Sequence, residues 1–288
     1  MTGQAPVVRT ATEADMPAIT AILEANDEPV TWPDVPRPPY VEHLLTRPGM
    51  RLVVGELDGS VAGVAGTIEV GRPGTRFLSD LYVDPARQSQ GLGRAMLRAA
   101  FEGAESRMTF SSRDPRALGA YIRNGMLPRW PLLYMEMAAG LLGPHEDGVE
   151  ARPANPAETA RRSLAWTGVD RTVDFDFYAR LPEASGFVVV IDGDLAAIGW
   201  ARRELAPPEG RWLDHASIAP HADPVRAAYA VLRAAAGGQR LGAALPGLHP
   251  AVAPLLERGV RIGDQDTFCA TDPDLFDPER IFPSPGLL

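Results

Sequence analysis

Lysine, cysteine and long apolar runs are the scarce features of this 288-residue sequence. All 28 of its basic residues are arginine, which excludes the lysine of a Walker A nucleotide loop and the Schiff-base lysine of pyridoxal-phosphate enzymes. The single cysteine, Cys269, excludes an internal disulfide and a cysteine metal cluster. The five histidines lack metal-ligand spacing, so we expect no metal.

Membrane and export signals are missing as well. A membrane-spanning helix needs about 18 consecutive apolar residues, and the best candidate, WPLLYMEMAAGLL at 130–142, is interrupted by Glu136. The first residues, MTGQAPVVRTATEAD, lack the basic-then-apolar order of a signal peptide. We therefore expect no membrane contact and a cytoplasmic location.

The charge balance is acidic, with a net charge of −9. Because proteins that bind a duplex usually carry a basic surface, we expect no nucleic acid partner. Residues 1–140 hold 14 arginines and 16 acidic residues, whereas residues 141–288 hold 14 and 21. The first half therefore suits an anionic ligand better, and the second half supplies most of the negative field.

The two halves repeat one order of patterns. Each begins with a short apolar strand, a polar turn and an amphipathic helix, at 7–23 and again at 149–165. A hairpin follows in each half, with turns predicted at Asp58-Gly59 and at Asp192-Gly193. Each half then continues with a strand, a helix, a second helix that ends in glycine, and a last strand. The pattern indicates a tandem duplication of one α/β unit.

Segment 138–150 lacks periodicity and is interpreted as a linker. We accordingly predict two domains, residues 1–140 and residues 148–288.

An anion site is predicted in the segment FLSDLYVDPARQSQGLGRAMLRAAFEGA, residues 77–104. A β-prone apolar stretch ends at Asp84-Pro85, and an amphipathic helix begins near Leu92. Between them, Gln88-Ser89-Gln90-Gly91-Leu92-Gly93 places two glycines at the start of a helix, where unpaired N–H groups point outward. Arg94 adds positive charge in the first turn.

The positions of the glycines in this loop, and the place of the loop along the chain, distinguish between classes of phosphate site. A dinucleotide fold would need a third glycine where Met96 stands, and its loop would follow the first strand. The pattern Q-x-x-G-x-G after a central strand instead resembles the coenzyme A loop of the GNAT superfamily of N-acetyltransferases. A second segment, DPRALGAYIRNGM at 114–126, resembles that superfamily's N-x-x-A-x-x-x-Y-x-x-x-G-F and departs from it at Asp114 and Met126. The resemblance is strong over residues 5–137 and extends to 149–271 only in layout.

The resemblance implies an α/β (α+β) fold of two tandem GNAT-type units, each a mixed, mostly antiparallel sheet flanked by helices. It also implies acetyl-CoA as the co-substrate. The pyrophosphate would be held by the glycine loop, the pantetheine arm would lie along the end of the preceding strand, and a Val83 N–H would reach the thioester oxygen. The implied cofactor-binding residues are Leu81, Tyr82, Val83, Gln88, Ser89, Gln90, Gly91, Leu92, Gly93 and Arg94.

Tyr121 matches the tyrosine of the second segment and would donate a hydrogen bond or proton to the departing thiolate. Two carboxylates are candidates for the general base, Glu69 and Asp80, and Asp80 is favoured because its strand carries the cofactor arm. A structural ion pair is the other reading of Asp80. Trp32 and Tyr40, from the proline-rich segment 28–45, are candidates for contacts with the acceptor; a plain surface loop is the other reading of that segment.

The second half has lost the glycine loop. Asp223-Pro224-Val225-Arg226-Ala227-Ala228 stands at the corresponding place, and Leu255 stands opposite Tyr121. We therefore predict a degenerate second unit and one active site, which transfers an acetyl group from acetyl-CoA to an amine by direct attack in a ternary complex. The acceptor is expected to be small and cationic. The alternatives are a coenzyme A-binding sensor or scaffold without turnover, and a transferase with another acyl group or an oxygen acceptor.

Overall fold

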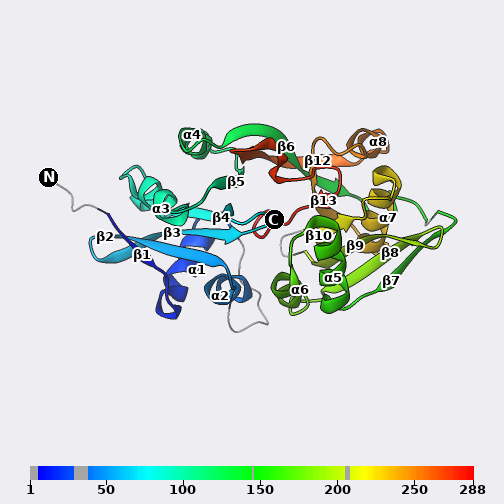
Figure 1. Cartoon of the computed structure of the whole chain (residues 1–288), viewed down its shortest axis with the longest axis horizontal. Helices are drawn as coiled ribbons and strands as arrows, with labels where there is room; N and C mark the ends of the chain where they lie inside the picture. Colours follow the sequence, from blue (N-terminus) through cyan, green and yellow to red (C-terminus); the bar gives the residue numbers. More distant parts are fainter. Residues whose placement is uncertain (1–5, 29–37, 145, 205–207) are drawn as a thin grey trace. The chain divides into compact units, whose positions relative to one another are not determined.

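The computed structural model describes residues 6–28, 38–144, 146–204 and 208–288 (Figure 1). The chain divides into two compact units, Met1–Thr109 (unit 1) and Phe110–Leu288 (unit 2). Among the helices of the described residues, none is long and apolar enough to cross a membrane.

Unit 1 is built on a sheet with the strand order β1-β2-β3-β4-β5. Neighbouring strands are antiparallel, except that β4 and β5 run parallel. The last two residues of β5 belong to unit 2. The elements, in chain order, are β1 (Val7–Thr10), η1 (Glu13–Asp15), α1 (Met16–Glu24), α2 (Pro39–Thr46), β2 (Met50–Leu57), β3 (Ser60–Glu69), β4 (Thr75–Val83), η2 (Pro85–Arg87), α3 (Leu92–Ala100) and β5 (Ser106–Ser111).

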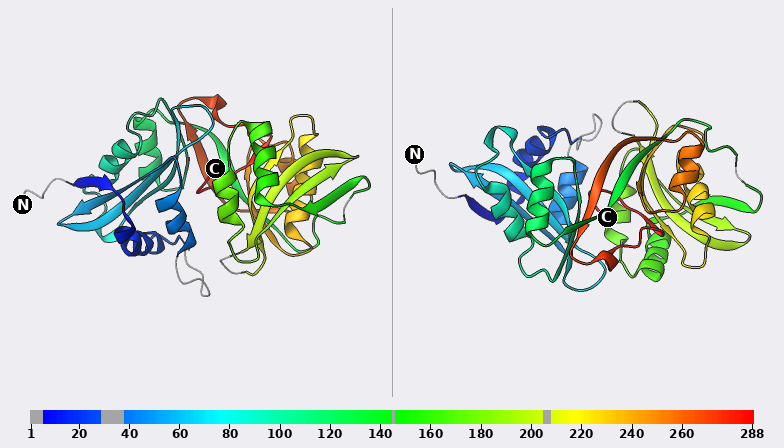
Figure 2. Two further views of the ribbon diagram at one scale, coloured as in Figure 1. Left: turned by 60° about the horizontal axis from the view of Figure 1, so that its bottom comes forward. Right: turned by 90° about the horizontal axis from the view of Figure 1, so that it is seen from above.

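Helices cover both faces of the unit 1 sheet. Figure 1 shows α3 on one face and α1 and α2 on the other, and the turned views of Figure 2 agree. The apolar face of α3 closes a buried cluster against the sheet, made of Val53, Leu57, Ala62, Ala65, Leu92, Met96 and Ala100. On the other face, α1 buries Ile19 and Leu23, and α2 buries Val41 and Leu44. This sandwich fixes both β4 and the start of α3.

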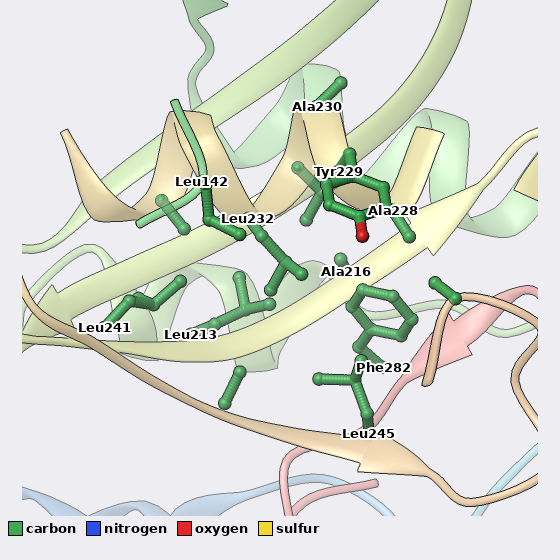
Figure 3. Close-up of a cluster of buried hydrophobic side chains, with 14 of the residues drawn as sticks. Leu142, Leu213, Ala216, Ala228, Tyr229, Ala230, Leu232, Leu241, Leu245 and Phe282 are labelled. Atoms are coloured by element: carbon green, nitrogen blue, oxygen red, sulfur yellow. The ribbon is translucent and has the colours of Figure 1, made fainter. Parts of the chain in front are cut away.

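Unit 2 has the strand order β12-β6-β11-β10-β9-β8-β7, and β13 pairs with β10. Its elements are α4 (Pro115–Arg123), β6 (Leu127–Met137), β7 (Val149–Pro153), α5 (Pro156–Thr167), α6 (Thr172–Tyr178), β8 (Ser185–Ile191), β9 (Asp194–Arg203), β10 (Arg211–Ile218), α7 (Pro224–Ala236), β11 (Leu241–Pro246), α8 (Val252–Glu257), β12 (Arg261–Ala270), η3 (Pro273–Leu275) and β13 (Ile281–Phe282). Figure 2 shows α7 on one face of this sheet and α5 and α6 on the other. Helix α7 packs on the largely aliphatic cluster of Figure 3.

The duplication expected from the sequence is confirmed by the order of elements. From β7 to β12 the chain repeats, element by element, the order of strands and α-helices from β1 to β6. Both hairpins turn at the predicted Asp-Gly pairs, whose φ angles are +51° and +76° at Asp58 and Gly59, and +54° and +90° at Asp192 and Gly193. These left-handed conformations are those of the two-residue turns that suit a twisted hairpin. The mixed, mostly antiparallel sheet with flanking helices also confirms the predicted fold class.

A salt bridge lies at the same position at the start of each repeat. Arg9 on β1 pairs with Asp15 at 2.8 Å, and Arg152 on β7 pairs with Glu158 at 2.7 Å. In both cases the acid lies six residues beyond the arginine, at the start of the first helix of the repeat.

The division by contacts does not coincide with the division by repeats. Strand β6 belongs to the first repeat, yet it pairs with β11 and β12 of the second. Contacts therefore separate the units after Thr109. The predicted domains 1–140 and 148–288 follow the repeats and stay a prediction.

The close packing of β3 under α3 makes Gly63 sensitive to substitution. A Cβ atom there would lie 2.6 Å from the Met96 side chain and 2.9 Å from the Tyr82 carbonyl oxygen, which cannot move freely. We expect Gly63→Ala to lower the free energy of unfolding by about 1–3 kcal/mol, measured by urea denaturation. As a control, Gly119→Ala on α4 meets its nearest atom only at 3.5 Å and should leave stability unchanged or raise it. Equal effects of the two changes would contradict this packing argument.

Candidate functional site

The end of β4 is paired on one edge only within the described residues of unit 1. Strand β3 accompanies β4 from Arg76 to Val83, whereas β5 pairs with it only over Thr75–Leu78. The register with β3 shifts at Ser79, which is the extra residue of a β-bulge. Ser79–Val83 therefore presents one edge of backbone N–H and C=O groups that β5 does not take. An extended ligand could pair there.

The glycine loop follows this end of β4. Gln88 is extended, and Ser89 and Gly91 have φ angles of +67° and +83°. Gly91 is the N-cap residue of α3, and the first helical bond runs from the Ala95 N–H to its carbonyl oxygen at 3.2 Å. The N–H groups of Leu92, Gly93 and Arg94 thus belong to the first turn, where a helix offers no partner of its own.

Space and charge at this helix start suit an anion. An ideal Cβ on Gly91 would have no heavy atom within 4 Å, and the Arg94 side chain is exposed. Positively polarised N–H groups and the helix dipole favour a phosphate at such a position. The loop expected from the sequence therefore has a conformation that could hold a pyrophosphate.

Side chains of this region are used for packing rather than for contact with a ligand. Leu92 is buried in the cluster under α3, and Leu81 and Val83 pack against that cluster. The Val83 carbonyl oxygen accepts hydrogen bonds from Asn26 at 3.3 Å and from Gln88 at 3.5 Å. Gln90 is exposed. What Leu81, Val83 and Leu92 can offer to a ligand is thus their backbone.

Asp80 is the buried carboxylate of the site, with 4% of its surface exposed. It lies directly after the bulge, opposite Gly66 of β3. The Tyr40 hydroxyl donates to both of its carboxylate oxygens, at 3.2 and 3.1 Å. Burial raises the pKa of Asp80 to about 7, against the opposing effect of hydrogen bonds from Ser79 and Tyr40. A carboxyl group with this pKa can take up and release a proton at neutral pH.

Tyr40 thus contacts the candidate base. Burial and the neighbouring Asp80 charge hold the pKa of its phenol well above the usual value, so the hydroxyl remains a donor. Nearby on unit 1, the Tyr82 hydroxyl donates to Glu28 at 2.7 Å, and the Glu28 charge contributes to the raised pKa of Asp80. The sequence pattern placed Tyr82 only on the cofactor strand, and Glu28 only at the start of the segment 28–45 that was expected to contact the acceptor. Alternation along β4 was the available signal for Tyr82. Trp32 lies outside the described residues.

Glu69 and Asp80 lie in different places. Glu69 is exposed at the end of β3, opposite Arg76, and accepts a long hydrogen bond from the Gly74 N–H at 3.4 Å. Arg76 is seven residues from Val83, which is roughly 23 Å along a strand. Of the two carboxylates, Asp80 is therefore the one nearer to the end of β4 that leads into the glycine loop.

Tyr121 belongs to unit 2 and is the buried residue of α4. Its segment has the local geometry that its sequence requires. Asp114 caps α4 by accepting from the Arg116 N–H at 2.8 Å, as asparagine would, and Met126 is fully buried where the pattern has phenylalanine. The two departures from the superfamily's pattern thus preserve capping and packing. The role of Tyr121 stays a prediction.

At the equivalent helix start in unit 2, side chains of the chain itself take the place where a phosphate would lie. Asp223 is the N-cap of α7 and accepts from the Arg226 N–H at 2.7 Å, and Pro224 in the first turn has no N–H to offer. The Arg226 guanidinium is paired with Glu146 and Asp192. An incoming phosphate would meet a carboxylate here. Among the described residues, no group of three or more His, Cys, Asp or Glu could hold a metal ion.

Comparison with known proteins agrees with this geometry. Residues 18–126 match the sequence model of the acetyltransferase (GNAT) family. No curated protein sequence matches the chain.

Several solved structures share the fold over nearly the whole chain. A putative acetyltransferase from Pyrococcus horikoshii is 15% identical with a TM-score of 0.71, and the match covers 100% of this chain and 94% of that one. A tandem GNAT protein from the clavulanic acid biosynthesis pathway is 17% identical with a TM-score of 0.62, covering 94% and 99%. A glucosamine N-acetyltransferase region of a fungal multi-domain β-N-acetylglucosaminidase is 14% identical with a TM-score of 0.64, covering 94% and 38%. Residues 18–126 thus carry the match to the acetyltransferase (GNAT) family, and the chain as a whole shares the fold of these solved structures, one of which is a tandem GNAT protein.

Proposed function

We propose that this chain transfers the acetyl group of acetyl-CoA to the amine of a small, cationic acceptor at one site in the first repeat. One observation carries the proposal: a glycine-capped helix start with open space follows a strand whose last residues do not pair with the neighbouring strand β5. The first feature suits a pyrophosphate and the second suits the amide-containing arm of coenzyme A. Asp80 lies on the same strand, three residues before its end.

Acetyl-CoA supplies a thioester, whose carbonyl carbon is attacked by the acceptor nitrogen. The backbone N–H groups from Gln88 to Arg94 would hold its pyrophosphate, and Leu81, Tyr82 and Val83 would pair with its arm through their backbone. A Val83 N–H directed at the thioester oxygen would stabilise the negative charge that develops there.

The proton inventory assigns a role to each titratable group. An aliphatic amine has a pKa near 10 and arrives as an ammonium ion. Asp80 would take one proton from it, directly or through water, and the freed nitrogen would form the C–N bond. As the C–S bond breaks, Tyr121 would give its phenolic proton to the sulfur, and the second proton lost by the acylated nitrogen would restore the phenol and leave a neutral amide. Asp80 would release its own proton to water. Tyr40 would keep Asp80 in place by donating to both carboxylate oxygens.

The charges around Asp80 favour a cationic acceptor. Glu28 and Asp80 are both carboxylates of unit 1, and Glu28 already affects the pKa of Asp80 through its charge. The second half of the sequence adds most of the negative charge of the chain. An ammonium ion would be attracted by this field, and the same field would disfavour an acidic acceptor.

Thiol release in the presence of an amine library tests the activity itself. Free thiol that appears only with chain, acetyl-CoA and amine together supports the proposal. Firm binding of acetyl-CoA without release of thiol with any amine would favour a sensor or scaffold instead.

The pyrophosphate site is tested by Gly91→Asp, which adds a carboxylate beside the loop N–H groups. We expect the affinity for coenzyme A, measured by calorimetry, to fall at least about tenfold, or about 1.4 kcal/mol. Gly103→Asp is a matched control, because Gly103 follows the other end of α3, has a φ of +74° and also has open space at its Cβ. Both variants carry the same backbone strain and added charge, so equal losses would contradict the site.

The titration of Asp80 can be followed by carboxyl NMR. We expect a pKa of about 7 in the native chain, and Tyr40→Phe should raise it by about one unit because a hydrogen bond to the charged form is lost. The acid limb of kcat/KM against pH should move upward equally. Tyr82→Phe removes a hydroxyl bonded to Glu28 instead and should leave the Asp80 titration within a few tenths of a unit. An unmoved limb in Tyr40→Phe would exclude Asp80 as the base.

The same pKa predicts how stability depends on pH. The folded chain keeps the Asp80 proton up to about pH 7, whereas the unfolded chain loses it near pH 4. The free energy of unfolding therefore includes the full contribution of Asp80 below about pH 4 and loses this contribution as the pH rises through about 7. The free energy of unfolding of Asp80→Asn, measured by urea denaturation, should lack this part of the pH dependence. An unchanged dependence on pH would contradict the raised pKa of Asp80.

Tyr121→Phe tests the proposed proton donor. Turnover should fall about 10²–10⁴-fold, the usual contribution of a general acid, while coenzyme A affinity stays unchanged. Tyr134→Phe, which removes a hydroxyl bonded to Asp266 in the same unit, controls for a general loss of stability. Wild-type turnover in Tyr121→Phe, with chemistry shown to be rate-limiting, would exclude the role.

A further inference from the structure

Strand β10 of unit 2 repeats the special features of β4. It pairs in parallel with β11 only over Arg211–Leu213, and its register with β9 shifts at Asp214, the extra residue of a bulge. Ala216–Ile218 therefore corresponds to Leu81–Val83, the part of β4 that does not pair with β5. If no other segment paired there, the backbone groups on this edge of β10 would be available to an extended ligand.

In unit 2 the edge is filled by the chain's own residues 277–288, named here the closing segment. Within it, β13 pairs antiparallel with β10, with Phe282 opposite Ala216 and Ile281 opposite Ser217. The Ile218 N–H donates to the Arg280 carbonyl oxygen at 2.8 Å. The Arg280 guanidinium in turn donates to the carbonyl oxygens of Ala219 and Ala222. The free edge is thus satisfied by an extended peptide.

Side chains anchor the closing segment into the core of unit 2. Phe282 is 1% exposed and belongs to the cluster of Figure 3, where its ring lies beside Ala216 and Leu245. His249 meets the same ring edge to face at 5.0 Å. Near the other end of the segment, Leu287 is buried, and its carbonyl oxygen accepts from the buried Arg171 guanidinium of unit 2 at 3.2 Å.

We propose that the closing segment is the permanent internal ligand of the second repeat, pairing with β10 at the place where the arm of an acyl-CoA would pair with β4. The comparison with acyl-CoA rests on the proposed function. The closure itself rests only on pairing and burial within unit 2. Two independent features then exclude a second acyl-CoA: Asp223 at the helix start, and residues 277–288 along the strand.

Hydrogen exchange tests the closure. In a chain that ends at Phe276, the amide of Ile218 loses its acceptor and should exchange at least about tenfold faster, together with its neighbours on β10. A synthetic peptide of residues 277–288 added in trans should restore protection, and the same peptide with Phe282→Ala should not. Unchanged protection in the shortened chain, or no rescue by the native peptide, would overturn the proposal.

A second variant keeps the test decisive if the shortened chain does not fold. Arg280→Ala in the full chain removes only the two guanidinium bonds to the turn after β10 and should speed exchange at Ile218 about threefold or more. Arg261→Ala, at an exposed position on β12, is the control and should not. Equal exchange in the two variants would contradict a closing role. Neither test uses acyl-CoA, so a failure of the proposed acetyl transfer at β4 would leave these results unchanged.

Discussion

A strand that loses its parallel neighbour halfway along is the constraint on which this structure depends. In each repeat a bulge, at Ser79 or at Asp214, follows the last residues that pair with the parallel neighbour. Backbone groups left at such an edge need partners, because a buried unpaired N–H or C=O costs free energy. The two repeats meet this need differently. Unit 2 supplies β13 to β10, whereas in unit 1 the last residues of β4 do not pair with β5.

The two bulges also place carboxylates under different electrostatic conditions. Asp214 in unit 2 is buried beside Arg202 at 3.1 Å, and its pKa is raised to about 6. Asp80 lies one position further along its strand, is hydrogen-bonded by the hydroxyls of Tyr40 and Ser79, and has a pKa of about 7. The cause in both is burial, which disfavours the charged form. Of the two, Asp80 is the one that lies three residues before a strand end leading into a helix without a side-chain cap. Carboxylates with a strongly shifted pKa are common at functional sites.

Local patterns predicted the parts of this fold that are local. The Asp-Gly turns, the repeated order of elements and the glycine loop depend on residues close in sequence, where propensity and periodicity are informative. The bond from Tyr40 to Asp80 joins residues 40 positions apart, and β13 reaches β10 from more than 60 residues away. The pairing of β6 with β11 and β12 is equally non-local, so contacts divide the chain at Thr109 rather than at the linker that the sequence indicates. Glu69 and Asp80 look alike in sequence, and only the register of β3 with β4 separates them.

The helix starts show what the first repeat gives up in stability. Helix α7 is 13 residues long, is capped by Asp223 and ends at a left-handed Gly237, whereas α3 is nine residues long and has no side-chain cap. A capping side chain contributes about 1 kcal/mol, and Ser89 in a left-handed conformation costs about another 1 kcal/mol or more. A carboxylate at Gly91 could recover the cap, but it would place negative charge where a phosphate would bind in the proposed function. An uncapped, strained loop after β4 is what the proposed binding of a phosphate would require, and the capped second repeat shows the same fold without that requirement.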